Sequence, residues 1–298
     1  MLESRIGELA ALATAFCWTI TALAFETASR KVGSVAVNII RLIMAFVLLG
    51  LFSWFNRGLF LPLDASSYSW FWLILSGLVG FVIGDLFLFE AFTLIGSRLS
   101  MLIMTLVPPI TAIQGWLLMG EQLSYINIAG MLMTMSGIAL VIFQKHKPGS
   151  SRIKYPVKGL FFAFLGAAGQ ATGYALSKYG MGDYDPFAAT QIRVIAGIFG
   201  FGILVSFFRR WRAVFYAVKQ PKPMFLMLLG ATFGPFIGVS LSLLAAQNTN
   251  TGIAATIMAI TPILIIPPTM IFFKQSVSWK EIAGAAISVA GVSLFFIF

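Results

Sequence analysis

The stretch AVNIIRLIMAFVLLG at residues 36–50 has a counterpart in AATQIRVIAGIFGFG at residues 188–202. Both stretches are mainly apolar and carry one arginine at the same place, Arg41 in the first and Arg193 in the second, 152 residues apart. Further pairs have the same offset, with a slip of only two residues: Gly7 and Gly159 at 152, and Pro108 and Pro262, Gly130 and Gly284, and Gly137 and Gly291 at 154. This nearly gap-free spacing indicates that the second half of the chain is a copy of the first.

Composition places the chain in a membrane. Hydrophobic residues make up 59% of it and charged residues 10%, and its mean hydropathy is +0.94, beyond what a water-soluble domain tolerates. A helix needs about 20 apolar residues to cross the hydrocarbon core. Ten stretches qualify: 7–28, 35–55, 68–91, 97–118, 124–143, 157–178, 186–208, 223–246, 252–273 and 279–298. We therefore predict an all-α integral membrane protein with ten transmembrane helices in two five-helix repeats, an architecture typical of secondary transporters.

The sequence also argues against several kinds of site. The one cysteine, Cys17, cannot form an internal disulfide or a cysteine metal cage, and the one histidine, His146, lies in a basic loop. We therefore expect no metal and no cofactor. The net charge of +10 comes from loops beside the spans, where it serves orientation rather than nucleic-acid binding. Glu3 and Glu8 surround Arg5, which is unlike a signal peptide, so we expect the first span to stay in the mature protein.

The distribution of lysine and arginine predicts the orientation. Apart from Arg41 and Arg193, fifteen of these residues lie in the loops after spans one, three, five, seven and nine, and three lie at the termini or in the other loops. The positive-inside rule places the first set of loops in the cytoplasm and both termini outside the plasma membrane. Because each half has an odd number of spans, the second repeat crosses the membrane upside down relative to the first.

Three parts of the chain follow from this topology. Residues 1–143 form the first five-helix repeat, residues 144–156 a basic cytoplasmic linker, and residues 157–298 the second, inverted repeat. The linker either determines the topology, which we favour, or binds anionic lipid or a regulator. Because both copies are fused in one chain, a monomer is sufficient for function.

The motifs in these spans resemble those of a known family. Trp18, the segment IIRLIMAFVLL at 39–49 and the segment TLVPPITAIQGWLLMGEQLSYINIAGMLMTMSGIALVIF at 105–143 look like the EamA family of the drug/metabolite transporter superfamily. The resemblance covers nearly the whole chain, and Arg193 and Pro262 keep it in the second copy. It implies a proton-coupled or exchange-type carrier, or an exporter, of amino acids, metabolites or drugs. It also implies a central cavity lined by spans one, three, four, six, eight and nine.

Two positions depart from the family pattern. The Gly-Glu pair at 120 and 121 becomes Lys274-Gln275 in the second copy. At the end of span one the usual basic residue is Glu26, whereas Lys178 keeps it in the second copy. A substrate role for the family's basic residue is therefore not carried over to Glu26.

Charged side chains within the spans mark candidate functional positions, because each costs roughly 3 kcal/mol or more at the centre of a membrane helix unless it has a partner or water. Near the inner face we predict a polar cluster of Glu26, Arg41, Asp85 and Glu90. Inverted symmetry places Arg193 near the outer side. Its charged neighbours in the sequence there are Lys178, Asp183 and Asp185.

The roles of these charges divide into coupling, gating and packing. Arg41 and Arg193 either tie helices together or take part in gating or substrate contact, and both interpretations stay open. Asp85 has no acidic counterpart in the second repeat, where Val239 is equivalent. Our hypothesis is that Asp85 or Glu90 is the coupling proton site, because burial disfavours an ionised carboxylate.

Polar and aromatic residues at mid-depth are the candidates for the substrate cavity: Trp18, Gln114, Gln170, Tyr174, Ser242 and Gln247. Trp18 is either a packing aromatic or a ring that stacks on substrate. Walls of this kind, with few charges, favour a small amphipathic organic solute over a sugar phosphate, which would need clustered cations.

Pro108 and Pro262 interrupt the backbone hydrogen bonding of spans four and nine at matching positions. They are either passive kinks or hinges, and their symmetry favours hinges.

We predict a secondary active transporter for a small organic metabolite, working by alternating access as an exporter or proton-coupled exchanger. The alternative is a passive channel or a non-transporting scaffold. An intramembrane aspartyl protease does not fit, because Tyr184-Asp185 lies in a loop and the motif around Gly84-Asp85 is incomplete, so we expect no enzyme activity.

Overall fold

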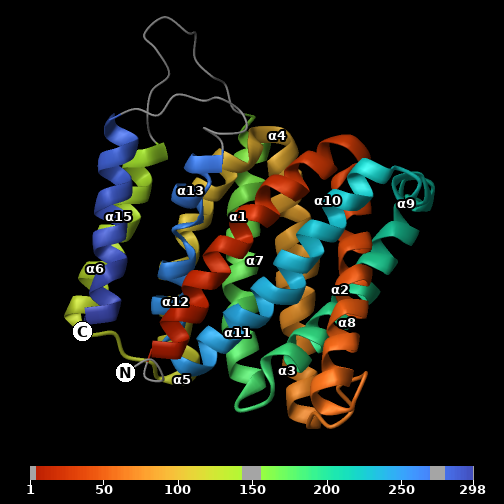
Figure 1. The fold of residues 1–298 in the computed structure, drawn as a ribbon, viewed down its shortest axis with the longest axis horizontal. Coiled ribbons are helices and arrows are strands. Elements are labelled where there is room, and N and C mark those ends of the chain that lie inside the picture. Colours follow the sequence, from red (N-terminus) through yellow and green to blue (C-terminus); the bar gives the residue numbers. More distant parts are fainter. Residues whose placement is uncertain (1–4, 143–155, 269–278, 298) are drawn as a thin grey trace, which may run out of the picture.

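The computed structural model describes residues 5–142, 156–268 and 279–297, and every regular element in these ranges is a helix (Figure 1). The first half contains α1 (Ile6–Val32), α2 (Ser34–Arg57), α3 (Ser67–Gly77), the π-helix η2 (Leu78–Gly84), α4 (Asp85–Ile103), the 3₁₀-helix η3 (Met104–Leu106), α5 (Val107–Met119) and α6 (Tyr125–Ile142). The second half contains α7 (Val157–Met181), α8 (Pro186–Phe207), α9 (Trp211–Val218), α10 (Pro221–Ala231), the π-helix η4 (Thr232–Gly238), α11 (Val239–Asn248), α12 (Thr251–Met258), α13 (Thr261–Leu264) and α15 (Trp279–Ile297).

The helices have the length and composition of membrane spans. Within the described ranges, seven stretches are long and apolar enough to cross a bilayer: 6–32, 34–57, 67–97, 157–181, 186–207, 221–248 and 251–268. Three shorter apolar helices accompany them at 104–119, 125–140 and 282–295. The prediction of an all-helical, multi-pass membrane protein is confirmed, whereas the exact number of ten crossings stays a prediction.

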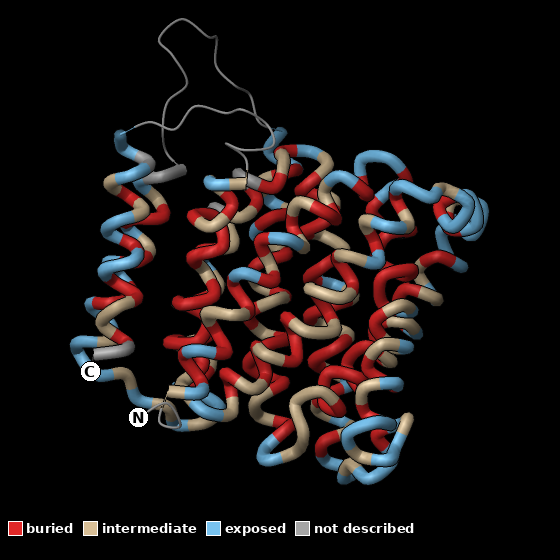
Figure 2. Tube along the Cα trace, in the orientation of Figure 1, coloured by how far each residue is buried: buried red, intermediate tan, exposed pale blue. Residues whose placement is uncertain are grey.

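The outer surface of the bundle is apolar. Phe199, Ile203 and Phe207 follow one another at four-residue intervals on α8, and their exposed fractions are 70%, 69% and 78%. Buried residues face the interior of the bundle in Figure 2, and exposed ones follow its periphery and its two ends. An apolar exterior of this kind fits lipid as the surrounding solvent.

Glycines with positive φ make two of the tight turns between spans. Gly33 (φ 86°) separates α1 from α2. Gly96 (φ 79°) interrupts α4 and separates the predicted spans 68–91 and 97–118. Because this backbone conformation is costly for residues with a Cβ, glycine at these positions allows consecutive helices to reverse without a loop.

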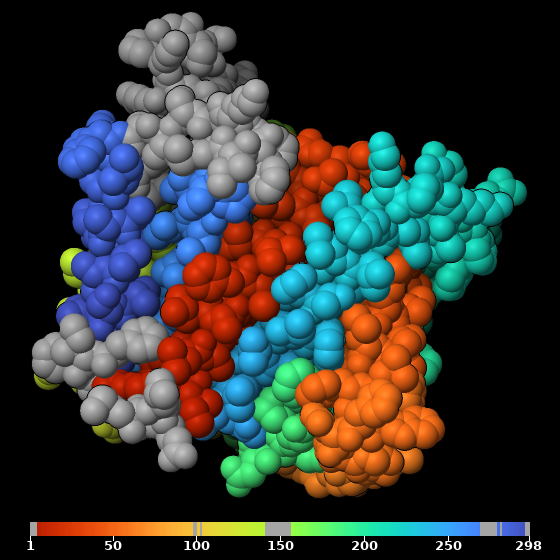
Figure 3. Space-filling model, in the orientation of Figure 1, coloured from red at the N-terminus to blue at the C-terminus, as the bar shows by residue number. Residues whose placement is uncertain are grey.

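The two halves make reciprocal contacts. Helix α1 packs against α10, η4 and α11, and its counterpart α7 packs against α3, η2 and α4. Figure 3 shows α1 and the α10–α11 segment as adjacent diagonal bands on one face. Counterparts also pair with each other, α2 with α8 and α6 with α15. Contacts that repeat with the halves exchanged are what a two-fold relationship between two copies produces.

Two details support this symmetry at the level of single residues. The π-helices η2 and η4 begin at Leu78 and Thr232, 154 residues apart and therefore at equivalent positions. Between α6 and α15, Thr134 Oγ1 donates to Ser288 O at 3.5 Å and Ser288 Oγ donates to Thr134 O at 3.1 Å. These two residues are also 154 positions apart. Equivalent residues that bond reciprocally lie where the symmetry axis passes between the copies.

The reciprocal interfaces are not equally tight. Helix α7 approaches η2 backbone to backbone, because a Cβ on Gly169 would lie 2.7 Å from Gly84 Cα and a Cβ on Gly173 would lie 2.7 Å from Gly80 Cα. At the other interface, aromatic side chains of α1 cover the glycines of α10 and η4, with Phe25 over Gly230. These large side chains fill the space between α1 and its neighbour, and Phe25 also lines the central cavity.

One segment differs from its sequence prediction, and another lies almost entirely outside the described residues. The connection after the predicted span 186–208 contains the short helix α9, in which Val214 and Ala217 are buried and Phe215 is exposed. Its pattern is amphipathic, so it forms a helix at the edge of the bundle rather than a simple loop. All but the last residue of the predicted linker at 144–156 lies outside the described residues.

The two ends of the chain lie close together. Helix α1 begins and α15 ends at the same end of the bundle (Figure 1), and Arg5 Nη1 donates to Phe295 O at 3.0 Å. The structure therefore brings the start of α1 and the end of α15 to one end of the bundle. Which side of the membrane this is stays a prediction.

Candidate functional site

A cavity of about 130 Å³ lies between the two halves of the bundle. Helices α1, α4, α5, α7, α11 and α12 form most of its wall, which includes the predicted spans one, three, four, six, eight and nine. The second helix of each half, α2 and α8, contributes only its arginine, Arg41 and Arg193. The repeated arginines therefore meet at one cavity.

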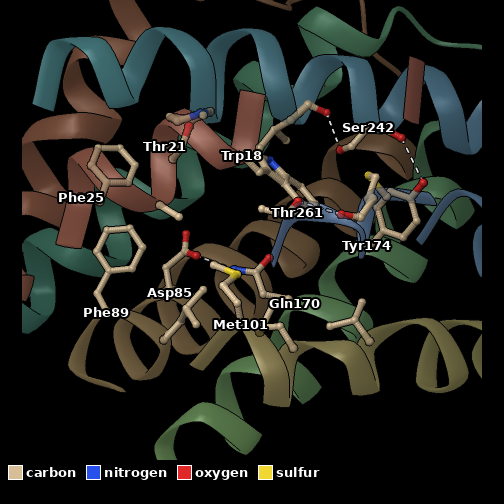
Figure 4. A pocket seen from close by; sticks show the side chains of 18 of the residues that line it. Trp18, Thr21, Phe25, Asp85, Phe89, Met101, Gln170, Tyr174, Ser242 and Thr261 are labelled. Carbon is tan, nitrogen blue, oxygen red and sulfur yellow. Dashed lines mark hydrogen bonds between the residues drawn. The ribbon is translucent and has the colours of Figure 1, made fainter. Parts of the chain in front are cut away.

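Aromatic rings and methionines form the apolar part of the wall. Figure 4 shows Phe25 and Phe89 beside Asp85, with Trp18 and Met101 on other sides of the cavity. Trp18 Nε1 makes no hydrogen bond to any residue that the structure describes. A ring of this kind gives a bound solute both an apolar face and a free donor.

Arg41 and Asp85 form a buried ion pair in the wall. They are 3% and 5% exposed, and Arg41 Nη2 donates to Asp85 Oδ2. Arg41 Nε also donates to Asn38 Oδ1 at 3.0 Å, and Gln170 Nε2 donates to Asp85 Oδ1. The Arg41 guanidinium carbon lies 4.7 Å from the centre of the Phe89 ring. Both charges are therefore compensated by partners, as burial in a membrane interior requires.

Arg193 has a different environment. It is 4% exposed, and its guanidinium carbon lies 4.8 Å from the centre of the Phe81 ring. Among the described residues no ion pair is formed with Arg193, and its buried Nε has no hydrogen-bond partner. Asp85 is near enough to attract it electrostatically but is already bound by Arg41 and Gln170. Arg193 therefore brings an unpaired positive charge to the cavity.

The expected surroundings of Arg193 are corrected by this geometry. Asp185 instead caps the N-terminus of α8, where its Oδ1 accepts from Ala188 N at 2.8 Å. Lys178 forms an ion pair with Glu121. Arg193 lies two turns further along α8 than Asp185, on the face that looks into the cavity, so these residues do not reach it.

The predicted inner cluster is only partly formed. Arg41 and Asp85 meet, whereas Glu26 pairs with Arg30 at 3.0 Å and also accepts from Ser97. Glu90 accepts from Ser34 near the start of α2. Because Glu90 follows Asp85 by five residues, it points from a different side of α4 and meets α2 two turns before Arg41.

Four of the six predicted cavity residues line the cavity: Trp18, Gln170, Tyr174 and Ser242. Tyr174 Oη donates to Ser242 O at 3.1 Å, and Ser242 Oγ donates to Val239 O at 2.7 Å, so these hydroxyl protons are engaged within the protein.

Gln114 and Gln247 are not in the lining. Gln114 Nε2 donates to Thr172 Oγ1 at 2.9 Å. Gln247 Nε2 donates to the carbonyls of Gly182 and Tyr184, both at 2.8 Å. Their helices present these side chains to neighbouring helices or loops, which periodicity in a uniformly apolar span does not reveal.

The paired prolines lie at equivalent helix breaks. Pro108 is near the start of α5, after the 3₁₀ turn at Met104–Leu106. Pro262 is near the start of α13, after α12 ends at Met258, and it lines the cavity. Spans four and nine are therefore both discontinuous beside the cavity.

One polar cluster joins the halves at the end of the bundle where α5 meets α7 and α12. Lys178 Nζ lies 2.6 Å from Glu121 Oε1 and donates to Thr249 O at 2.8 Å. Glu121 Oε2 accepts from Thr251 N at 2.9 Å and from Thr251 Oγ1 at 2.7 Å. The sequence marks Gly120-Glu121 and Lys178 as separate departures from the repeat pattern and gives no sign that they are in contact.

A second cluster joins the α7–α8 connection and the start of α8 to the α2–α3 connection. Arg57 Nη2 donates to Asp64 Oδ2, and Tyr184 Oη donates to Asp64 Oδ1 at 2.8 Å. Burial raises the pKa of Tyr184 to about 12, so this hydroxyl keeps its proton at physiological pH. Gln191 Nε2 adds a bond to Phe60 O at 2.8 Å. This end of the bundle is therefore closed by contacts between the two halves.

Comparisons with known proteins agree with the architecture. The model of the EamA-like transporter family matches residues 5–143 and 157–297. A search of curated proteins found no match. Among solved structures, 29 chains match, and one, described only as the crystal structure of a protein, aligns with a TM-score of 0.70 over 97% of this chain and 96% of that chain. At 17% sequence identity this likeness shows a shared fold.

Proposed function

Because the chain belongs to the EamA-like transporter family, we propose that it is a secondary active transporter which carries a small organic metabolite, such as an amino acid or an amphipathic solute, across the plasma membrane. It acts as an exporter or proton-coupled exchanger. Its repeats, 1–143 and 157–298, are inverted relative to each other, and both termini and the Glu121–Lys178 end face outward. The supporting observation is a cavity between the halves whose wall contains the charged group Arg41, Asp85 and Arg193.

Alternating access requires contacts that close one end and can be broken. The Glu121–Lys178 pair fits this role, because Glu121 belongs to the first half while Lys178 and Thr251 belong to the second. Side-chain exposure of 21% for Lys178 and 8% for Glu121 places the pair at the boundary with water, where an ion pair can separate without the full cost of burial. We assign it the role of the outer gate.

The helix breaks at Pro108 and Pro262 give the halves places to bend. In this proposal they act as hinges, because the backbone there lacks a continuous hydrogen-bond ladder. A Pro108→Ala variant is expected to slow exchange while leaving the concentration for half-saturation nearly unchanged, because Pro108 does not line the cavity. Unaltered exchange in both Pro262→Ala and Pro108→Ala variants would remove the hinge assignment.

Asp85 is the favoured coupling proton site, with Glu90 as the second candidate. Asp85 is the only carboxylate in the cavity lining among the described residues, and Arg41 holds its charged form. A proton on Asp85 would release Arg41, which links protonation to a change in the contacts between α2 and α4.

Counterflow in proteoliposomes tests the proposed function. Vesicles are loaded with an unlabelled member of a panel of amino acids and amphipathic metabolites, and uptake of the labelled solute is followed with and without a pH gradient. A carrier gives saturable, transient accumulation of label. Uptake that is proportional to concentration and indifferent to internal solute would instead indicate the alternative, a passive channel.

A further inference from the structure

Arg193 brings to the cavity a cation that has no ion-pair partner among the residues that the structure describes. The described lining contains three formal charges, Arg41, Asp85 and Arg193, of which Arg41 and Asp85 are paired with each other. One positive charge remains on Arg193, which is 4% exposed and whose Nε has no hydrogen-bond partner among the described residues. An unpaired buried charge is strongly unfavourable, so the site is incomplete without an anion or water.

The fold makes room for this side chain. A Cβ on Gly80 would lie 3.1 Å from Arg193 Nη2, so the guanidinium rests directly on the backbone of η2. The ring of Phe81 covers it at 4.8 Å. The guanidinium is therefore held in place by packing while its Nε has no hydrogen-bond partner among the described residues, an arrangement suited to a planar anion.

We propose that Arg193 binds the carboxylate of a monocarboxylate substrate, whose apolar body lies against Trp18, Phe25, Phe89 and Met101. This proposal rests on the proposed function, because a bound carboxylate is a substrate only if the protein is a transporter. A single negative charge neutralises the one cation that is unpaired. A carboxylate also accepts two parallel N–H bonds from a guanidinium, and the aromatic and methionine walls hold an apolar body by burial of its surface.

Other anions fit less well. A phosphate dianion would leave a net negative charge, since Arg41 is engaged by Asp85. Chloride would neutralise Arg193 but would leave the apolar walls without a partner. The geometry therefore favours an organic anion with one charge.

Binding of matched probes tests this assignment. The purified full-length protein in detergent is titrated with 3-phenylpropanoate and with its uncharged isostere 3-phenylpropanamide, and L-phenylalanine is compared with L-phenylalaninamide. Binding is read from thermal stabilisation and from tryptophan fluorescence. The acid is expected to bind about tenfold or more tightly than the amide, because the amide carries no charge and offers the guanidinium one acceptor oxygen instead of two.

Substitutions of Arg193 test whether this side chain causes the tighter binding of the acid than of the amide. Arg193→Gln is expected to abolish the difference between acid and amide, and Arg193→Lys to retain part of it. Arg212→Gln, which removes one exposed positive charge on α9, is the matched control and should behave as the wild type. If Arg193→Gln does not fold, the comparison of acid with amide in the wild type and in the Arg193→Lys variant still tests whether Arg193 binds the carboxylate.

Several results would overturn the proposal. Equal binding of acid and amide, an undiminished acid preference in folded Arg193→Gln, or no binding of either acid to folded protein would each do so. Stabilisation by chloride that the acids do not displace would mean an inorganic anion only. Counterflow of a neutral or cationic solute without carboxylate binding would refute this inference and leave the carrier intact, whereas carboxylate binding without any counterflow would refute the carrier alone.

Discussion

Arg41 and Arg193 lie 152 residues apart in the sequence, yet their guanidinium carbons lie 5.8 and 4.8 Å from the centre of the same ring, Phe81. The two copies of this arginine have different partners. Arg41 is paired with Asp85, and Arg193, whose half has Val239 in place of that aspartate, has no ion-pair partner among the described residues. Because this symmetry is lost, the cavity contains one arginine that is paired with a carboxylate. The other arginine has no such partner among the described residues and is available to a ligand.

Removing Asp85 should cost more stability than removing Arg41. Asp85→Asn leaves two buried arginines without a carboxylate, and we expect a loss of about 3 kcal/mol in unfolding free energy. Arg41→Gln should cost less, because Asp85 can then turn to Arg193. Unfolding in detergent, followed by tryptophan fluorescence, measures both, and Arg41→Gln/Asp85→Asn should lose less than the sum of the singles. Additive losses would show that the pair is not energetically coupled.

Proton coupling should depend on Asp85. Asp85→Asn is expected to keep counterflow of solute but to lose the acceleration by a pH gradient, since the amide cannot exchange a proton. Glu90→Gln is the comparison, because Glu90 bonds to Ser34 rather than to Arg41. Loss of acceleration in Glu90→Gln alone would move the site to Glu90. Retention of pH-driven transport in both variants would remove the coupling hypothesis for these carboxylates.

Opening of the outer gate should depend on the opposite charges of Glu121 and Lys178. A cysteine at Ser242, in a Cys17→Ser background, reports access to the cavity through its reaction with a membrane-impermeant maleimide from outside. Glu121→Gln should raise the labelling rate about fivefold, as expected for an ion pair worth ~1 kcal/mol.

Charge reversal provides the control for the gate. Glu121→Lys alone should also raise labelling, and Glu121→Lys/Lys178→Glu should return it toward the original rate. An unchanged labelling rate in all three variants would show that the Glu121–Lys178 pair does not close this end of the bundle.

Glycine substitutions should separate packing from helix propensity. Gly169→Ala places a Cβ 2.7 Å from Gly84 Cα, so the α7–η2 interface must separate and the yield of folded protein should fall sharply. Gly202→Ala meets nothing within 4 Å and should be neutral or stabilising by up to ~1 kcal/mol. Size-exclusion profiles and unfolding midpoints compare the two. Equal behaviour would mean that the close approach of α7 to η2 contributes little.

Much of the fold could be predicted because it depends on local signals. Apolar length predicts the spans, the 152–154 spacing predicts the duplicate helices, and Pro108 and Pro262 mark real helix breaks. Helix α9 was missed because its amphipathic pattern is only eight residues long.

The site was less predictable because it depends on which face each helix presents. The π-helices η2 and η4 shift the faces of the residues that follow them, and an apolar sequence gives no sign of that. Gln114 and Gln247 therefore could not be separated from Gln170, nor could the unpaired state of Arg193 be foreseen. That state depends on Asp85 having other partners, which only the packed structure shows.

A reversible cross-link across the outer gate tests the central claim most directly. Glu121→Cys and Lys178→Cys are combined in a Cys17→Ser background, joined by a short reducible thiol cross-linker, and assayed for counterflow beside the two single-cysteine controls. If the cavity is reached alternately from two sides, cross-linking will abolish counterflow in the double variant alone, and a reductant will restore it. Undiminished counterflow in fully cross-linked protein would contradict the account, because this end of the bundle would then not need to open.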